Sequence, residues 1–228
     1  MASTTLPTDD GYVRSPFPCC DVAALQELFA MVAGAPTSTH AVGFRRLLMT
    51  ITAMGGVEGA IPPSMGVQIL EAAACSAARE GDIRLLGSAL TALIDEWYPI
   101  YTNKTAPASF LSGASEFVAM YILYWACVVT QPCDVGLSLQ KVQLLPVAAD
   151  SAPLAHAMEI SHAWRAQNYV RFGRLLDASP MKLRLVGQYG FHDMTTRAAA
   201  VRSRAFRGSL PELPQFLSMG ESCCKPSP

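Results

Sequence analysis

Residues 82–97, DIRLLGSALTALIDEW, carry the clearest periodic pattern in the chain. Their large apolar side chains recur every three or four positions, at Ile83, Leu86, Leu90, Leu93, Ile94 and Trp97. That spacing places them on one face of an α-helix. Residues Glu80 to Asp82, which lead into this helix, are typical of a turn. The stretch therefore predicts a helix that buries one face against a core.

The segments that precede this helix show the same kind of pattern. Asp21 is a suitable N-cap for an amphipathic run that ends before Gly34 and Pro36. A second helix is predicted from Ala41 to Met54, and a third from Pro63 or Ser64 to Arg79. The small residues 72–74 in the third helix predict close approach of a neighbouring helix.

The next segment, Pro99 to Gly113, is predicted to be a loop, and Ser115 is predicted to open a strongly apolar helix. The most apolar part of that helix runs from Phe117 to Thr130 and has 14 residues. A helix that spans a membrane needs about 20 apolar residues. We therefore predict a buried core helix, in which the aromatic residues at helical spacing are part of the core.

The remainder of the chain is predicted to form short helices. It contains no alternation of apolar and polar residues that would indicate a strand. Residues 131–152 are predicted to be a connector with one short helix, followed by a helix from His156 to Arg165. Asn168 is predicted to cap the next helix, which Pro180 ends. Two further helices are predicted, over residues 181–190 and from an Asp193 cap to Gly208. The fold class is thus all-α, a bihelical solenoid or an irregular bundle.

The amino-acid composition indicates a folded protein. Of the 228 residues, 51% are hydrophobic and 15% are charged, which excludes a disordered chain. We predict one helical domain over residues 21–217, with flexible tails at residues 1–20 and 218–228.

The N-terminal sequence shows no secretory signal, so an intracellular protein is expected. Seven scattered cysteines make a poor disulfide framework, and most of them are predicted to be buried thiols.

No catalytic constellation is visible in the sequence. The four histidines never occur at helical spacing with a flanking glutamate, and there is no Cys-x-x-Cys pair for zinc. Gly-rich phosphate-binding motifs and the Gly-x-Ser-x-Gly nucleophile motif are also missing. The sequence therefore predicts a protein that is not an enzyme, with no catalytic, cofactor-binding or metal-binding residues and no small-molecule substrate.

The charges are unevenly distributed along the chain. Residues 1–164 contain seven Lys or Arg and fourteen Asp or Glu, whereas residues 165–207 contain nine and two. Such a basic segment predicts an anionic partner, either RNA phosphates or an acidic peptide. The alternative is a solvated helix face with local ion pairs. The candidate binding residues are Arg165, Arg171, Arg174, Arg184, Arg197, Arg202, Arg204 and Arg207.

Two segments also carry a family pattern: SEFVAMYILYWACV at residues 115–128 and HAMEISHAWRAQNYVRFGRLLDASPMKLRLV at residues 156–186. They resemble the SAC/GANP family of PCI-type proteins, whose founding members are scaffolds of the nuclear mRNA export machinery. The likeness extends from Gly81 to Pro211, and the family's expected Arg and second Phe are replaced by Met120 and Gly173. The central residues of the motif are Glu116, Phe117, Tyr124, Asn168, Tyr169, Phe172, Leu175 and Pro180. Of these, the aromatic residues Phe117, Tyr124, Tyr169 and Phe172 are predicted to belong to the core.

The resemblance implies a PCI-like stack of bihelical repeats in which the winged-helix subdomain is absent or truncated. It implies a non-catalytic adaptor in nuclear mRNA export or processing that binds another PCI-domain protein, with a small acidic helical protein and RNA as further partners and no membrane contact. A nuclear location follows, with a cytoplasmic pool as the alternative. Proteasome-lid, translation-initiation and centrosome or spindle-associated roles remain open as alternatives within the same class.

Overall fold

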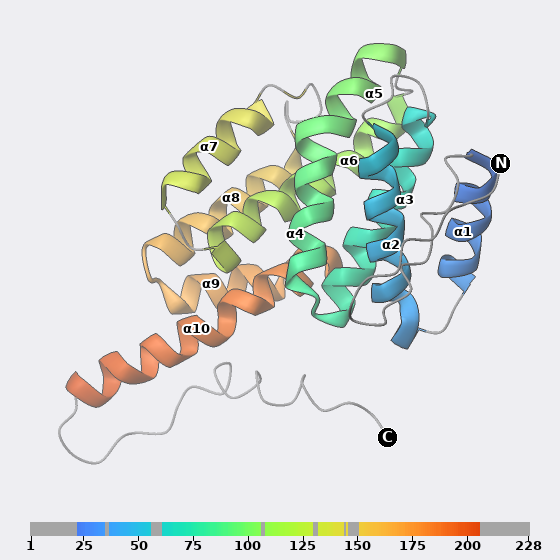
Figure 1. The fold of residues 1–228 in the computed structure, drawn as a ribbon. Coiled ribbons are helices and arrows are strands. Elements are labelled where there is room, and N and C mark those ends of the chain that lie inside the picture. The colour runs from blue at the N-terminus through green and yellow to red at the C-terminus, as the bar shows by residue number, and fades with distance from the viewer. Residues whose placement is uncertain are drawn as a thin grey trace.

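The structure is a succession of α-helices, which confirms the predicted all-α class (Figure 1). It is a computed structural model that describes residues 22–34, 37–55, 61–105, 108–129, 132–143, 145 and 151–205, and these contain no strand. The elements are α1 (Val22–Gly34), α2 (Thr37–Gly55), α3 (Pro63–Glu80), α4 (Ile83–Ala92), η1 (Leu93–Trp97), α5 (Tyr98–Thr105), α6 (Ala108–Leu123), η2 (Tyr124–Val129), α7 (Pro132–Gln143), α8 (Ala152–Arg165), α9 (Tyr169–Asp177) and α10 (Met181–Ala205).

Two antiparallel helix pairs lie on either side of α6. One pair is α3 and α4, the other is α8 and α9, and α6 contacts both α4 and α8. The long helix α10 crosses this arrangement and contacts α3, α6, α9 and η2. The apolar segment predicted to be a core helix forms the buried centre, since Val118, Met120 and Ile122 are fully buried. Among the described residues, no helix is both long and apolar enough to cross a membrane.

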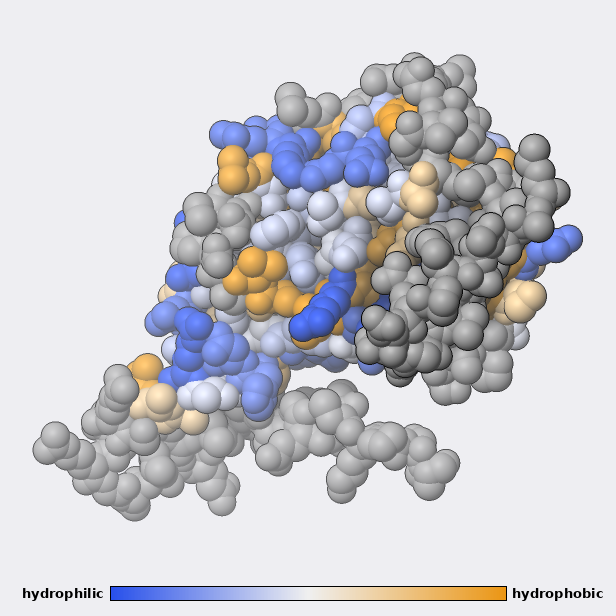
Figure 2. All heavy atoms as spheres, in the orientation of Figure 1, coloured by the Kyte–Doolittle hydropathy of each residue, from blue (hydrophilic) through white to orange (hydrophobic). Residues whose placement is uncertain are grey.

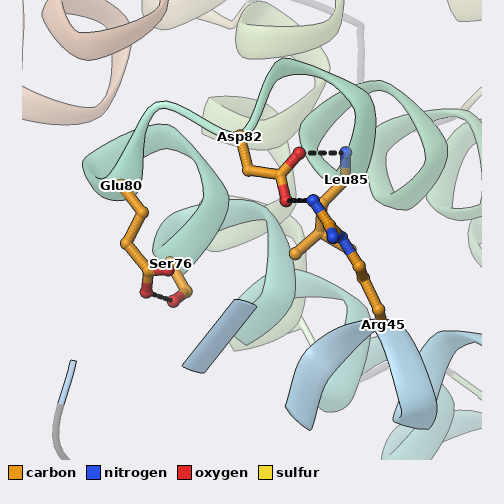
Figure 3. Close-up of polar contacts among 5 residues, drawn as sticks. All are labelled: Arg45, Ser76, Glu80, Asp82 and Leu85. Carbon is orange, nitrogen blue, oxygen red and sulfur yellow. Dashed lines mark hydrogen bonds and ion pairs between the residues drawn. The ribbon is translucent and has the colours of Figure 1, made fainter. Parts of the chain in front are cut away.

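The turn between α3 and α4 is fixed by polar contacts (Figure 3). Gly81 adopts φ of 81°, a left-handed conformation that suits glycine. The Asp82 carboxylate accepts a hydrogen bond from the Leu85 amide at 3.1 Å and pairs with Arg45 of α2. Burial would raise the pKa of Asp82, but these contacts outweigh it and lower the pKa below its usual value. The turn thereby joins α2 to the α3–α4 pair.

The predicted loop from Pro99 to Gly113 is wrong, because α5 begins at Tyr98 and α6 at Ala108. The helix that starts at Ile83 continues through η1, a π-helical turn in which the Tyr98 amide donates to the Leu93 carbonyl. A π-helical turn shifts the hydrogen-bond register by one residue. Here the shift falls immediately before Pro99, which has no amide hydrogen to donate. The proline is therefore accommodated within the helix.

The predicted break near Gly190 is also wrong, because α10 is continuous from Met181 to Ala205. Gly190 serves a close approach instead: a Cβ built there would lie 2.8 Å from the Cβ of Cys127 in η2. Asp193 is not an N-cap, since its carboxylate pairs with Arg197 one turn later at 2.7 Å. The predicted cap at Asp21 and the predicted end at Gly208 lie outside the described residues.

Candidate partner-binding surface

A tight turn joins α8 to α9 and holds the two helices side by side. Gln167 adopts a left-handed φ of 52°, and the Asn168 amide donates to the Ala163 carbonyl at 3.0 Å. The Asn168 side chain then accepts a hydrogen bond from the Arg171 amide at 3.0 Å, which confirms the predicted N-cap of α9. The hairpin geometry is therefore fixed by local contacts.

Replacing Asn168 with alanine is expected to lower the free energy of unfolding by about 1 kcal/mol, because the amide of Arg171 loses its side-chain acceptor. Asn168→Asp keeps an acceptor at the helix N-terminus and should retain wild-type stability. Urea denaturation followed by circular dichroism measures both changes. Equal stability of the alanine variant and the wild type would show that the cap contributes nothing.

His156 links the beginning of α8 to the end of α9. Its Nε2 atom lies 2.8 Å from the Ser179 hydroxyl and 3.1 Å from the Leu175 carbonyl. The Ser179 hydroxyl also donates to the Leu175 carbonyl at 2.8 Å. His156 belongs to the family-like pattern, and its contacts give it a structural role at the open end of the hairpin.

An aromatic cluster attaches this hairpin to α10. The ring of Phe172, which is fully buried, lies 5.6 Å from the ring of Trp164 and 6.5 Å from that of Phe191. These three residues come from α9, α8 and α10. Aromatic contacts of this kind add to the stabilisation from burial alone. The cluster therefore makes the three helices one packed unit.

The hairpin presents three exposed arginines: Arg165, Arg171 and Arg174. Arg171 pairs with Glu159 at 3.5 Å, and both side chains are more than half exposed, at 58% and 56%. Exposed ion pairs of this kind contribute little stability, so Arg171 can exchange this partner. Within the described part of the chain, neither Arg165 nor Arg174 forms an ion pair. These arginines are open to an anionic partner.

The other predicted arginines are differently placed. Arg184 donates to the carbonyls of Asp177 and Ser179 at 2.6 and 3.3 Å, and thus satisfies the C-terminal end of α9. Arg197, besides its pair with Asp193, lies 5.8 Å from the Trp164 ring. Arg202 and Arg204 lie in α10, but their side chains are outside the described part, as is all of Arg207. Figure 2 shows hydrophilic residues gathered over α9 and the adjoining part of α10.

The motif residues hold α6, α9 and α10 together. Glu116 of α6 pairs with Lys182 of α10 at 2.6 Å, and the Lys182 ammonium lies 4.7 Å from the Phe117 ring centre. Phe117 is buried, whereas Tyr124, Tyr169 and Leu175 are half-buried and packed against the core. Pro180 is exposed, and its carbonyl accepts from the Arg184 amide at 3.0 Å in the first turn of α10. These contacts assign structural roles to the motif.

A polar cluster around Glu71 was not predicted from the sequence. The Tyr98 hydroxyl donates to the Glu71 carboxylate at 2.9 Å. Burial raises the pKa of Glu71, and the Tyr98 hydrogen bond and the charge of Lys182 offset that only in part. Burial likewise raises the pKa of the Cys75 thiol, and it raises that of Cys127 to about 12. From the sequence, only the four-residue spacing of Glu71 and Cys75 could be recognised. Lys182 comes from a distant part of the chain, so its proximity to Glu71 could not be predicted.

Glu71→Gln is expected to stabilise the protein at pH 7. A carboxyl group whose pKa is raised by folding favours the folded state when protonated and opposes it once ionised. The amide keeps an acceptor for the Tyr98 hydroxyl without carrying the buried charge. The gain in melting temperature should shrink as the pH falls towards the usual glutamate pKa of about 4.3. A gain that is independent of pH, or the same gain in the exposed control Glu96→Gln, would refute this explanation.

The residues described by the structure include no group of three His, Cys, Asp or Glu side chains that could hold a metal ion. Comparisons of the chain with protein-family models, curated proteins and solved structures found no match. The exposed arginines of the α8–α9 hairpin remain candidate binding residues.

Proposed function

We propose that this protein is a non-catalytic scaffold, an adaptor subunit of a nuclear mRNA export or processing complex that binds a second PCI-domain protein. The body would be a PCI-like stack of helix pairs, as the family-like pattern over residues 115–128 and 156–186 implies. The observation that supports the binding role best is the set of exposed arginines, Arg165, Arg171 and Arg174, on one firmly packed hairpin.

The proposed mechanism is surface complementarity. The cap at Asn168, the His156–Ser179 contact and the aromatic cluster fix the hairpin before any partner arrives. A fixed surface loses little conformational entropy on binding. Arginines on such a surface attract an anionic partner over a distance and form paired hydrogen bonds with carboxylates or phosphates on contact. Both RNA and an acidic polypeptide satisfy these requirements.

The test of this surface is a double charge reversal, Arg165→Glu with Arg174→Glu, in the purified full-length chain. Binding to fluorescein-labelled single-stranded RNA is followed by fluorescence anisotropy at increasing salt concentration. Each phosphate contact to a single strand contributes about −0.7 to the slope of log K against log salt. Loss of two contacts should therefore weaken binding and reduce that slope by roughly 1.4.

Arg46→Glu is the matched control, since Arg46 is exposed on α2. It should leave both the affinity and the slope unchanged. If the chain binds immobilised polyglutamate but not RNA, and the double variant loses that binding, the surface belongs to a protein partner. Binding that is insensitive to the double reversal, or equally sensitive to the control, would reject the hairpin surface.

A further inference from the structure

Helix α1 lies at the edge of the molecule, where α2 is its main packing partner (Figure 1). Its buried residues are Leu25 and Val32. A Cβ built at Gly43 of α2 would lie 2.6 Å from the Val32 side chain, so this side of α1 faces α2. The helix contains a single charged residue, Glu27, and its Met31 side chain is 70% exposed. Because α2 covers one side of α1, the other side leaves apolar surface in contact with solvent.

The exposed side of α2 is also rich in apolar residues. Val42, Arg46, Met49 and Ala53 recur after four, seven and eleven residues, so they lie on one side of the helix, which we call the α2 stripe. All four are exposed, Val42 by 57% and Met49 by 55%. The opposite side of α2 carries its buried residues, and α2 contacts α3. Exposed apolar side chains that gather on one face are typical of a contact with another chain.

The outer side of α1 repeats this spacing with smaller residues. Ala23, Glu27, Ala30 and Gly34 recur after four, seven and eleven residues and are all exposed; we call them the α1 stripe. Helical periodicity places this stripe opposite to Val32, the residue that faces α2. The α1 stripe therefore points away from α2 and cannot contact the α2 stripe of its own chain.

The two stripes carry opposite charges at the same position. Glu27 is the second member of the α1 stripe, and Arg46 is the second member of the α2 stripe. Within the described part of the chain, neither of them forms an ion pair, whereas the neighbouring Arg45 is engaged with Asp82. Both charges are thus available to another molecule.

A second copy of this chain supplies what each stripe needs. When Glu27 of one copy is set against Arg46 of the other, the two alanines of the α1 stripe fall opposite the valine and methionine of the α2 stripe, whether the helices run parallel or antiparallel. Small residues opposite large ones allow close packing. A wholly acidic or wholly basic partner, or RNA, would attract one of the two charges and repel the other. The charges therefore favour self-association.

We propose that this chain forms a two-fold symmetric dimer in which the α1 stripe of each copy packs on the α2 stripe of the other. The symmetry makes the same contact twice, so Glu27 meets Arg46 at two places. This inference goes beyond the scaffold proposal, which concerns a different surface. Figure 1 shows the α8–α9 hairpin on the side of the molecule away from α1, so both hairpins stay accessible in the dimer.

Sedimentation velocity of the purified full-length chain tests the dimer. Between about 1 and 200 µM the mass should rise from 24.4 kDa towards twice that value, because a small interface supports micromolar affinity. Glu27→Arg and Arg46→Glu should each raise the dissociation constant at least about tenfold, since each sets like charges against each other in both contacts. The double variant Glu27→Arg with Arg46→Glu should restore the wild-type dissociation constant.

Two aspartate variants test the apolar part of the contact. Met49→Asp should abolish the dimer, and Met181→Asp is the matched control, because Met181 is 69% exposed on α10 and lies outside both stripes. Circular dichroism at low protein concentration should show wild-type folding for both. The dimer is refuted if the chain stays monomeric over the whole range, if the double charge exchange does not restore association, or if the two aspartate variants weaken it equally.

The dimer and the hairpin surface fail in different variants. Arg165→Glu with Arg174→Glu should dimerise like the wild type, because neither residue belongs to a stripe. RNA binding, including that of Arg46→Glu, is measured at protein concentrations below the dissociation constant of the dimer, where every chain is a monomer. A monomeric wild type that binds RNA through the hairpin would overturn the dimer alone, and a dimer that binds no anionic partner would overturn the hairpin alone.

Discussion

Replacing Phe172 with alanine is expected to lower the free energy of unfolding by about 3–5 kcal/mol. The side chain is fully buried and its ring contacts those of Trp164 and Phe191, so three helices lose packing at once. Domains of this kind have total stabilities of about 5–15 kcal/mol. The variant should therefore unfold at a much lower urea concentration, measured by circular dichroism and tryptophan fluorescence.

Phe172→Leu serves as the graded control. Leucine keeps most of the buried volume and should cost less than about 1.5 kcal/mol. Because the cluster also positions the arginines of α8 and α9, the alanine variant should bind anionic partners more weakly even where it remains folded. A loss below about 1 kcal/mol for Phe172→Ala would mean that the three helices are not joined through this ring.

Gly66→Ala is expected to be the most destabilising of the small substitutions. A Cβ at position 66 would lie 2.0 Å from the ring of Trp97, so α3 and η1 would have to separate. Overpacking of a core costs about 1–3 kcal/mol, and here it opposes the gain of about 1 kcal/mol that alanine brings to a helix. Thermal unfolding should show a net loss of stability.

Gly136→Ala makes the same chemical change in α7 with the opposite expected result. Nothing lies within 4 Å of a Cβ built at this exposed position. The variant should gain up to about 1 kcal/mol from helix propensity alone. If both alanine variants change stability in the same direction, the close approach between Gly66 and Trp97 is not as tight as described.

The sequence predicted most helices because their apolar residues repeat at helical spacing. The stripe is buried as expected from Leu86 to Trp97, as is the apolar run from Phe117 to Leu123, whereas Ile83 at the start of the stripe is 39% exposed. The Asn168 cap was also predictable, since it depends on neighbours three residues apart. Local pattern was sufficient for these features.

The failures have two physical origins, a local change in helical hydrogen bonding and contacts between residues distant in the sequence. Pro99 and Gly190 read as breaks, yet a π-helical turn accommodates the first and packing against Cys127 explains the second. The engagement of Arg184 with the end of α9 and the pair between Lys182 and Glu116 depend on tertiary structure. The charge distribution along the sequence therefore predicted more arginines on one surface than the structure places there.

The scaffold proposal is tested most directly by affinity capture of the tagged chain, expressed at its native level in its own cells, with and without RNase. Mass spectrometry then compares the wild type with the Arg165→Glu, Arg174→Glu variant. We expect the wild type to recover a second PCI-domain protein together with mRNA export or processing factors, and the variant to lose part of that set. Recovery of proteasome-lid, initiation-factor or centrosomal subunits instead, or an identical set from both chains, would contradict the proposed role.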